Sequence, residues 1–398
     1  MPSTLKRMSE VFFEEKGRIK SGLAEWDRVL GGGILPGSFT IVTGDPGIGK
    51  STLLLQIADR LAEHHSVFYF STEESLAQLK LRAQRLGCLS DNVLFSDQAL
   101  FDSIASAIQM YKPAVAVIDS IQNCVLDSSD AIPGGVSQLR ELALRFMRLA
   151  KELGIAIILT GHITKEGAMA GPKTLEHMVD TVLYLSGEEQ WQTRMLRAVK
   201  NRFGPAGELG FFEMESAGLV EVADINAVLL ADATTSPGSV LVSYQEGSRF
   251  LLLELQALAV ASKFSVPQRV ISGVDYNQVI LIAAILEKHL KIKFSAYDIF
   301  FKVSGGFKIK GSAIDLGIAI ALLSTFFQKA LSERTVAIGE INLAGIIKPA
   351  ALGVQGLKEM MRLGVTSVAL SHRQQTADVT KCKICSFSKV HDVLMMFE

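Results

Sequence analysis

The sequence lacks the features that would place the chain in a membrane or outside the cell. Its 398 residues include only four cysteines, Cys88, Cys124, Cys382 and Cys385, and in a reducing compartment free thiols are favoured over disulfides. No apolar stretch is long enough to cross a bilayer, and residues 1–20 carry many charges and lack the apolar region of a secretory signal. We therefore expect a cytoplasmic protein with reduced thiols and no membrane partner.

The chain also lacks an excess of charge of either sign. It has 40 Lys and Arg residues against 41 Asp and Glu residues, whereas nucleic-acid-binding proteins often have a basic excess. Any contact with DNA or RNA must therefore depend on a few locally placed basic residues. Hydrophobic residues make up 48% of the chain, which favours a compact folded protein over a disordered one.

Two of the cysteines, Cys382 and Cys385, form a C-x-x-C pair near the C-terminus. A structural zinc site needs four ligands, and only His391 follows the pair closely. Metal binding is an alternative, but the spacing favours two unligated thiols in a turn or strand.

The first half of the chain alternates short apolar runs with helix-like segments, a pattern typical of a parallel sheet covered by helices on both faces. Beyond Val222 the pattern changes, and the small polar run 231–239 indicates a domain joint. We place the boundary near residue 225, between a domain of residues 1–225 and a second domain of residues 226–398. The expected strands are 39–43, 67–71, 115–118, 155–160, 182–185, 193–199, 240–244 and 250–255, and the expected helices are 51–62, 76–86, 138–153, 279–289 and 313–327.

A phosphate-binding loop is the strongest functional signal in the sequence. Residues 44–51 match G-x-x-x-x-G-K-[ST] and stand between an expected strand and an expected helix. The glycines let backbone N–H groups face a polyphosphate, and the helix N-terminus adds partial positive charge. Lys50 can reach the β- and γ-phosphates, and Ser51 can ligate Mg²⁺. The residues expected to bind ATP are Gly44, Asp45, Pro46, Gly47, Ile48, Gly49, Lys50, Ser51 and Thr52.

Three carboxylates are candidates for the remaining chemistry of ATP hydrolysis. Asp119 ends an apolar run and suits a Walker B carboxylate that helps to hold Mg²⁺, with an N-cap or turn aspartate as the alternative. Glu73 and Glu74 follow the run 67–71, where a parallel sheet gathers ligand-binding groups. Hydrolysis needs a base for the attacking water, and we favour Glu73; two acids that simply begin a helix are the alternative.

Lys200 and Arg202 follow the expected strand 193–199. Two residues apart, they would share one side of an extended chain. Such a pair could stabilise charge on a γ-phosphate, including one bound by a neighbouring subunit. On spacing alone, an ordinary solvated cationic turn is the simpler interpretation.

Several segments together resemble the bacterial RadA family, also called Sms, and the resemblance covers nearly the whole chain. It implies an α/β architecture in which a RecA-like P-loop ATPase domain precedes an α+β domain similar to the proteolytic domain of Lon. The segment KNRFG is the most specific. The segments are 30–37 (LGGGILPG), the phosphate loop, 71–75 (STEES), 165–167 (KEG), 175–180 (LEHMVD) and 200–204 (KNRFG).

The resemblance also implies a function. Family members are DNA-repair and recombination motors that use ATP, bind single-stranded DNA, form rings expected to be hexamers, and drive branch migration; branched DNA and a recombinase partner belong to the same expectation. Lys200 and Arg202 thereby gain a role in coupling ATP to DNA. Residues 163–172, with Lys165, correspond to a DNA-facing loop, although a flexible surface loop is the alternative. A nucleotide-gated assembly or signalling ATPase without DNA is the alternative function.

The chain departs from the family pattern in two places. The family usually begins with a four-cysteine zinc module, and no cysteine precedes Cys88, so we expect that module to be absent. Lon-like proteases use a Ser–Lys pair, but Ile314 stands at the nucleophile position and Val354 at the lysine position. Ser312 and Lys358 are nearby but out of register. We therefore expect an inactive protease domain that serves ring assembly and offers a DNA-binding surface.

Overall fold

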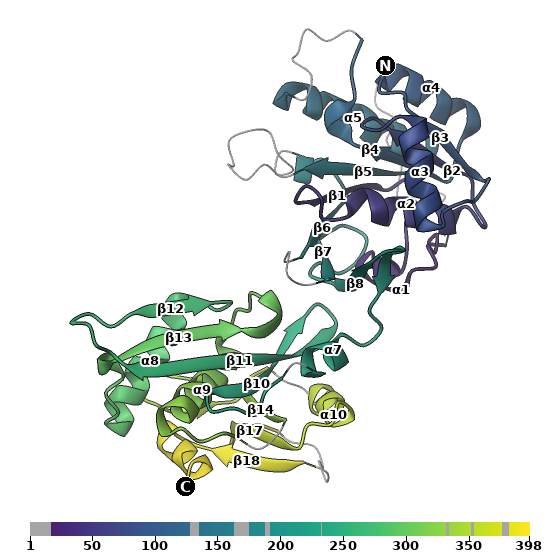
Figure 1. Ribbon diagram of the computed structural model, residues 1–398. Coiled ribbons are helices and arrows are strands. Elements are labelled where there is room, and N and C mark those ends of the chain that lie inside the picture. Colours follow the sequence, from purple (N-terminus) through teal and green to yellow (C-terminus); the bar gives the residue numbers. More distant parts are fainter. Residues whose placement is uncertain are drawn as a thin grey trace, which may run out of the picture. The chain divides into compact units, whose positions relative to one another are not determined.

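The protein, described here as a computed structural model, divides into two compact units, Met1–Val222 and Ala223–Glu398 (Figure 1). The structure describes residues 17–127, 135–162, 175–187, 192–231, 233–331, 334–351, 354–375 and 382–398. Within these ranges, no helix combines the length and the hydropathy needed to span a membrane.

Among the described residues of the first unit, nine strands form one sheet in the order β3-β2-β4-β5-β1-β6-β7-β8-β9. The strands from β3 to β6 in this order run parallel, and β7, β8 and β9 continue the sheet in antiparallel fashion. The expected parallel sheet is confirmed. The strands are β1 (Phe39–Gly44), β2 (Val67–Ser71), β3 (Val93–Ser96), β4 (Val115–Asp119), β5 (Ala156–His162), β6 (Thr181–Ser186), β7 (Thr193–Asn201), β8 (Leu209–Glu215) and β9 (Gly218–Glu221).

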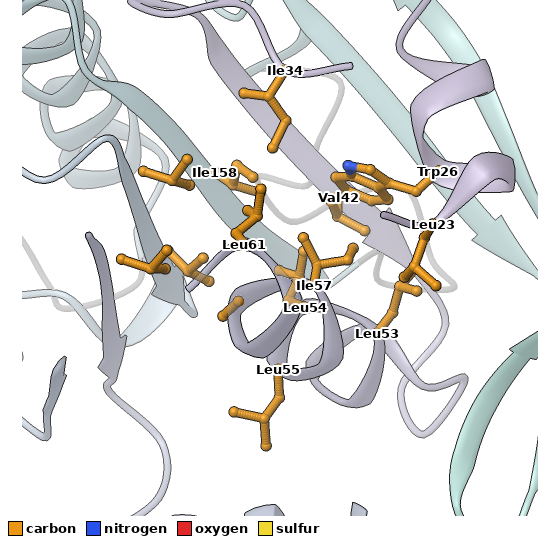
Figure 2. Packing of buried hydrophobic residues seen from close by; sticks show 14 of the residues in the cluster. Leu23, Trp26, Ile34, Val42, Leu53, Leu54, Leu55, Ile57, Leu61 and Ile158 are labelled. Carbon is orange, nitrogen blue, oxygen red and sulfur yellow. The ribbon is translucent and has the colours of Figure 1, made fainter. Parts of the chain in front are cut away.

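Helices cover both faces of this sheet, as Figure 1 shows for α2 on one face and for α4 and α5 on the other. Neighbouring residues of β1 point to opposite faces, so Val42 packs under α2 while Ile41 packs under α4 and α5. Figure 2 shows Leu54 and Ile57 of α2 beside Val42, in a cluster that includes Trp26. The helices are α1 (Ala24–Val29), α2 (Lys50–Leu61), α3 (Leu76–Leu86), α4 (Phe101–Tyr111) and α5 (Val136–Leu153), with a 3-10 turn η2 (Ile121–Asn123).

The structure adds elements that the sequence pattern did not predict, among them β3 and α4. β3 is an edge strand in which only Val93 is buried, so it carries almost no apolar signal. α4 begins after Leu100, which provides no side-chain cap, so the usual polar start signal is missing.

A side chain of α2 also fastens the last strand of the unit. Gln56 donates through Nε2 to the Leu219 carbonyl at 3.2 Å and accepts from the Leu219 N–H through Oε1 at 2.9 Å. Gly218 leaves room for this amide, because a Cβ there would lie 2.8 Å from Oε1 of Gln56. α2 and β9 are therefore joined by a two-way amide contact.

The end of β7 differs from the expected strand 193–199. The strand runs to Asn201, and its pairing with β6 slips by one residue, because Val182 faces Lys200 while Leu183 faces Ala198. Val199 is thus the extra residue of a β-bulge, a device that re-aims the side chains next to it. Lys200 lies inside the strand and not after it.

The second unit is an α+β domain built on a mixed sheet. Among its described residues, seven strands pair in the order β12-β13-β11-β10-β14-β17-β18. The predicted helix 313–327 begins at Asp315, because 312–314 form a 3-10 turn. The elements are α7 (Ile225–Ala231), β10 (Ser239–Glu246), β11 (Arg249–Ala261), β12 (Arg269–Ser272), α8 (Tyr276–Leu290), η3 (Phe294–Ala296), β13 (Tyr297–Val303), η4 (Ser304–Gly306), η5 (Ser312–Ile314), α9 (Asp315–Phe327), β14 (Thr335–Ile338), β15 (Glu340–Ile341), β16 (Ile347–Lys348), α10 (Val354–Arg362), β17 (Ser367–Ser371), β18 (Lys383–Phe387) and η6 (Val390–Met396).

A buried carboxylate, Glu254 of β11, holds the start of β10 in this unit. Only 3% of Glu254 is exposed. Its Oε1 accepts bonds from the N–H and hydroxyl of Thr234 at 3.0 and 2.8 Å and from the Ser239 hydroxyl. Its Oε2 accepts from Gln256 at 2.7 Å and from Ser304 at 3.0 Å. Burial alone would raise the pKa of Glu254, but the hydrogen bonds outweigh burial and lower it.

We predict that Glu254→Gln destabilises the second unit by about 3 kcal/mol at neutral pH, because an amide N–H₂ would face hydrogen-bond donors in a buried site. The folded-state pKa lies below the unfolded value, so the carboxylate's contribution is complete above about pH 4.3 and is lost as the pH falls through the folded pKa. Urea unfolding at several pH values should therefore show the stability difference from the unsubstituted protein narrowing in acid.

Glu359→Gln is the matched control for this prediction. Glu359 forms a partly exposed ion pair with Arg362 at 2.8 Å, and such surface pairs contribute little. A Glu254→Gln protein as stable as this control, or a difference that widens in acid, would contradict the prediction.

Candidate nucleotide-binding site

The phosphate loop leaves β1 at Gly44 and enters α2 at Lys50, and the backbone conformation at two of its positions favours glycine. Gly44 has a φ of 154°, and a Cβ there would lie 2.2 Å from the Leu185 carbonyl oxygen of β6. Gly49 has a φ of 113°, and its Cβ would lie 2.7 Å from the end of the Met214 side chain. At Gly44 a side chain would displace backbone, whereas at Gly49 the end of Met214 can move and the positive φ is what disfavours a side chain.

The loop and the helix that follows it fit the phosphates of a nucleotide. α2 begins after Gly49, which gives no side-chain cap, so the first N–H groups of the helix face the loop without a side-chain acceptor. Asp45, Pro46 and Gly47 are exposed at the same place. An open loop that ends in an uncapped helix N-terminus is a ready anion site.

Lys50 is buried beneath the loop, with 5% of the residue exposed. Its Nζ donates to the carbonyl oxygens of Gly44 and Asp45, each at 2.9 Å. Burial lowers the pKa of Lys50, while the charges of Asp119, Glu73 and Asp45 act in the opposite direction. The structure thus brings Lys50, Asp119 and Glu73 to one end of the sheet, as the sequence led us to expect.

Asp119 is the last residue of β4 and is held by hydroxyl groups of both neighbouring strands. Tyr69 of β2 donates to Oδ2 at 2.7 Å, and Thr160 of β5 donates to Oδ1 at 2.6 Å. Burial, followed by the charge of Asp119, raises the pKa of Tyr69 well above its ordinary value. The residue before η2 is Ser120, so Asp119 does not occupy the N-cap position that was the alternative for it.

The two neighbouring glutamates have different partners. Glu73 Oε1 accepts a bond from the Ser120 hydroxyl at 2.5 Å, next to Asp119. Glu74 Oε1 instead forms an ion pair with Arg82 of α3 at 2.5 Å. Ser75 caps α3 with its own side chain, so neither acid is the cap of that helix. Of the two, Glu73 is the one whose charge acts to raise the pKa of Lys50 in the phosphate loop.

Sequence reasoning missed the hydroxyl groups that support these carboxylates. Thr72 accepts from the Ser120 N–H at 2.9 Å and donates to the Ser120 carbonyl at 2.7 Å, while Thr72 N–H donates to the Asp119 carbonyl at 2.8 Å. The available signal was a polar residue directly after each apolar run: Thr72 after β2, Ser120 after β4 and Thr160 at the end of the run in β5. Parallel strands bring such residues to one edge.

Lys200 and Arg202 lie at the opposite end of the parallel strands. The Lys200 ammonium donates to the carbonyls of Glu176 and Val179 at 2.6 and 2.8 Å, and Arg202 pairs with Asp180 at 3.3 Å. Asp180 precedes β6 and pairs with Phe39, the first residue of β1, whereas the phosphate loop follows the last residue of β1. Lys165 lies outside the described residues.

The strand order, the phosphate loop between β1 and α2, and the carboxylates after β2 and β4 define the first unit as a RecA-like P-loop ATPase domain. In agreement, the AAA domain family matches residues 2–168. The family described as subunit ChlI of Mg-chelatase matches residues 277–373.

Comparison with curated proteins identifies the particular family. The chain is 45% identical over 365 residues to DNA repair protein RadA of Halalkalibacterium halodurans, covering 91% of this chain and 80% of the relative. It is 43% identical over 363 residues to DNA repair protein RadA of Pseudomonas aeruginosa, covering 91% and 80%. The chain belongs to the RadA family. The expected architecture is confirmed as a RecA-like ATPase domain followed by a Lon-protease-like domain.

Two solved structures are similar to about half of the chain. The flagellar accessory protein FlaH from Methanocaldococcus jannaschii is 20% identical and covers 52% of this chain and 99% of its own, with a TM-score of 0.41. The RadB recombinase is 22% identical and covers 51% of this chain and 99% of its own, with a TM-score of 0.39.

We predict that Glu73→Gln lowers kcat for ATP hydrolysis by about 10²–10⁴-fold, the usual contribution of a general base. The amide can still accept the Ser120 bond, so ATP binding should be retained. Glu74→Gln is the matched control, because Glu74 pairs with Arg82 and should change kcat by less than about threefold. Steady-state hydrolysis and nucleotide titration measure the two effects, and equal losses in both variants would refute the assignment.

Proposed function

We propose that the protein is a DNA-dependent ATPase motor of homologous recombination and DNA repair, which binds single-stranded DNA and promotes branch migration. The observation that carries the ATPase part is the convergence of Lys50, Asp119 and Glu73 at the phosphate loop. The DNA part follows from membership of a family whose relatives bear the name DNA repair protein RadA. Residues 1–225 form the ATPase domain in this proposal.

The chemistry divides among the residues of the site. Residues 44–52 bind the nucleotide, and Ser51 and Asp119 would hold Mg²⁺, which would neutralise negative charge on the phosphates. Lys50 binds the β- and γ-phosphates. Glu73, oriented by the Ser120 hydroxyl, accepts a proton from the attacking water.

Lys200 and Arg202 act on the nucleotide of a neighbouring subunit. Their anchors are at the Phe39 end of β1, and the five steps to Gly44 extend about 17 Å at the usual rise of a strand. An arginine side chain is too short to span that distance, so these residues do not reach the phosphate loop of their own subunit. Ring assembly, with six subunits as the expected number, would bring them to the next active site.

The same residues, together with Lys165, form the proposed DNA-coupling set. Subunit closure around ATP moves Lys200 and Arg202, and the segment that includes Lys165 follows DNA phosphates. Branched DNA and a recombinase are the further partners in this proposal, and the cytoplasm is its location.

The second unit serves assembly and DNA contact and not proteolysis. Ile314, at the position of the Lon nucleophile, is a hydrocarbon side chain with 1% exposure. The hydroxyl of Ser312 donates to Glu340 at 3.1 Å, and Lys358 is exposed on α10. These placements support a Lon-like domain of residues 226–398 without a Ser–Lys pair.

The test is steady-state ATP hydrolysis with and without single-stranded DNA, with Lys50→Ala as the blank. We expect DNA to stimulate hydrolysis and the variant to abolish both rates, because Lys50 is the residue that reaches the β- and γ-phosphates. DNA affinity should fall with salt, with a logarithmic slope of about 0.7 per neutralised phosphate of a single strand.

Hydrolysis that is indifferent to DNA would contradict the motor and favour a nucleotide-gated assembly or signalling ATPase. The near balance of 40 basic and 41 acidic residues is compatible with that second function. Affinity that does not change with salt would argue against phosphate contacts.

A further inference from the structure

Asp180 is a buried carboxylate that joins three separate segments of the first unit. Only 3% of the residue is exposed. Its Oδ2 accepts a bond from the Phe39 N–H at 3.0 Å and pairs with Lys151 of α5 at 2.5 Å. Its Oδ1 faces Arg202, whose guanidinium lies 3.3 Å away. The sequence motif that contains Arg202 therefore depends on a carboxylate 22 residues earlier in the chain.

The backbone around Asp180 holds the same motif. The N–H of Arg202 donates to the Asp180 carbonyl at 3.0 Å, and the turn just before Asp180 supplies both carbonyls that bind the Lys200 ammonium. Burial and the charge of Arg202 lower the pKa of Lys200, while Asp180 acts to raise it. One short segment thus positions both cations.

Arg202 is held at its base but remains accessible. Its side chain is 53% exposed, against 4% for that of Asp180. A cation that is already oriented by a hydrogen-bonded carboxylate and is exposed to solvent can bind an anion of another molecule with little further loss of side-chain entropy. Lys151 is also 45% exposed, but it pairs with the other oxygen of the carboxylate.

Asp180 also connects this cation pair to the strand that carries the phosphate loop. Its own N–H donates to the Phe39 carbonyl at 2.8 Å, so Phe39 and Asp180 exchange two hydrogen bonds. β1 continues from Phe39 to Gly44, where the loop begins. Asp180 therefore holds the Phe39 end of β1, and the phosphate loop begins at the Gly44 end of the same strand.

We propose that Asp180 is a positioning residue, whose Oδ1 orients Arg202 for the nucleotide of the adjacent subunit. The proposal rests on the function proposed above, in which Arg202 acts across the interface. The two carboxylate oxygens have different partners, which makes the proposal testable: Oδ2 contacts Phe39 of β1 and Lys151 of α5, and Oδ1 pairs with Arg202.

Asp180→Asn separates these two roles. An asparagine whose oxygen takes the Oδ2 position keeps the bonds from Phe39 and Lys151, and its N–H₂ then faces Arg202. We expect kcat for DNA-stimulated hydrolysis to fall about tenfold or more, as for the loss of one oriented charge-stabilising group. The KM for ATP should change little, because the phosphate loop keeps its contacts. The unfolding midpoint should fall, because a buried amide N–H₂ would face the donors of Arg202, so kcat is compared at a temperature at which both proteins are folded.

Two further variants distinguish orientation of Arg202 from general support of the fold. Lys151→Met removes one partner of Oδ2 and the ammonium 5.2 Å from the centre of the Phe203 ring, but leaves the pair between Oδ1 and Arg202, and kcat should stay within about twofold. Asp180→Asn added to Arg202→Ala should cause no additional loss, because residues that act through one another are not additive. An additional loss of tenfold, or a lower unfolding midpoint with unchanged kcat, would overturn the proposal.

Mixing full-length subunits tests the direction of action. Lys50→Ala subunits have a defective phosphate loop but an intact Asp180 and Arg202, so they should restore hydrolysis to Asp180→Asn subunits and equally to Arg202→Ala subunits. Mixtures of the last two variants with each other should show no rescue. Rescue of Arg202→Ala without rescue of Asp180→Asn would show that Asp180 serves its own phosphate loop, and would overturn the proposal.

Failure of both rescues would have a different meaning. It would overturn the action of Arg202 across the interface, which belongs to the proposed function. The dependence of Arg202 on Asp180 would still be reported by the double substitution, so the two failures remain distinguishable.

Discussion

The parallel pairing of β1 between β5 and β6 is the constraint on which the site depends. It places Gly44 so close to the Leu185 carbonyl that only a glycine fits at the point where the phosphate loop begins. The pairing of β5 with β4 then puts the Thr160 hydroxyl against Asp119. In this register of parallel strands, the carboxylates and the loop reach the same edge of the sheet.

The phosphate-binding groups and the paired cations lie at opposite ends of the parallel strands. The carboxyl ends of the parallel strands gather the phosphate loop, Asp119 and Glu73, whereas the amino ends carry Asp180 and the cations that it holds. A site that binds its own nucleotide at one end and presents cations at the other is suited to a ring of identical subunits, since each interface needs both.

The local parts of the site could be predicted from the sequence, and the long-range parts could not. The phosphate loop, Asp119 and Glu73 each follow an apolar run, so the residues next to them in the sequence predict their place at the end of a strand. The bond between Phe39 and Asp180 joins residues 141 positions apart, and no spacing rule reaches that far. The bulge at Val199 was missed because the polar residues Lys200 and Asn201 follow it, so the apolar run, and with it the expected strand, ends at Val199. Edge strand β3 was missed because burial, and with it hydrophobicity, is slight there.

The amide contact between Gln56 and Leu219 has a thermodynamic consequence. It couples the opening of α2, whose first turn belongs to the phosphate loop, to that of β9, since each would lose two partly buried hydrogen bonds if the other opened. Any ligand that binds the loop therefore stabilises β9 by mass action. β9 ends at Glu221, directly before the chain passes into the second unit. Nucleotide binding is therefore thermodynamically linked to the stability of β9.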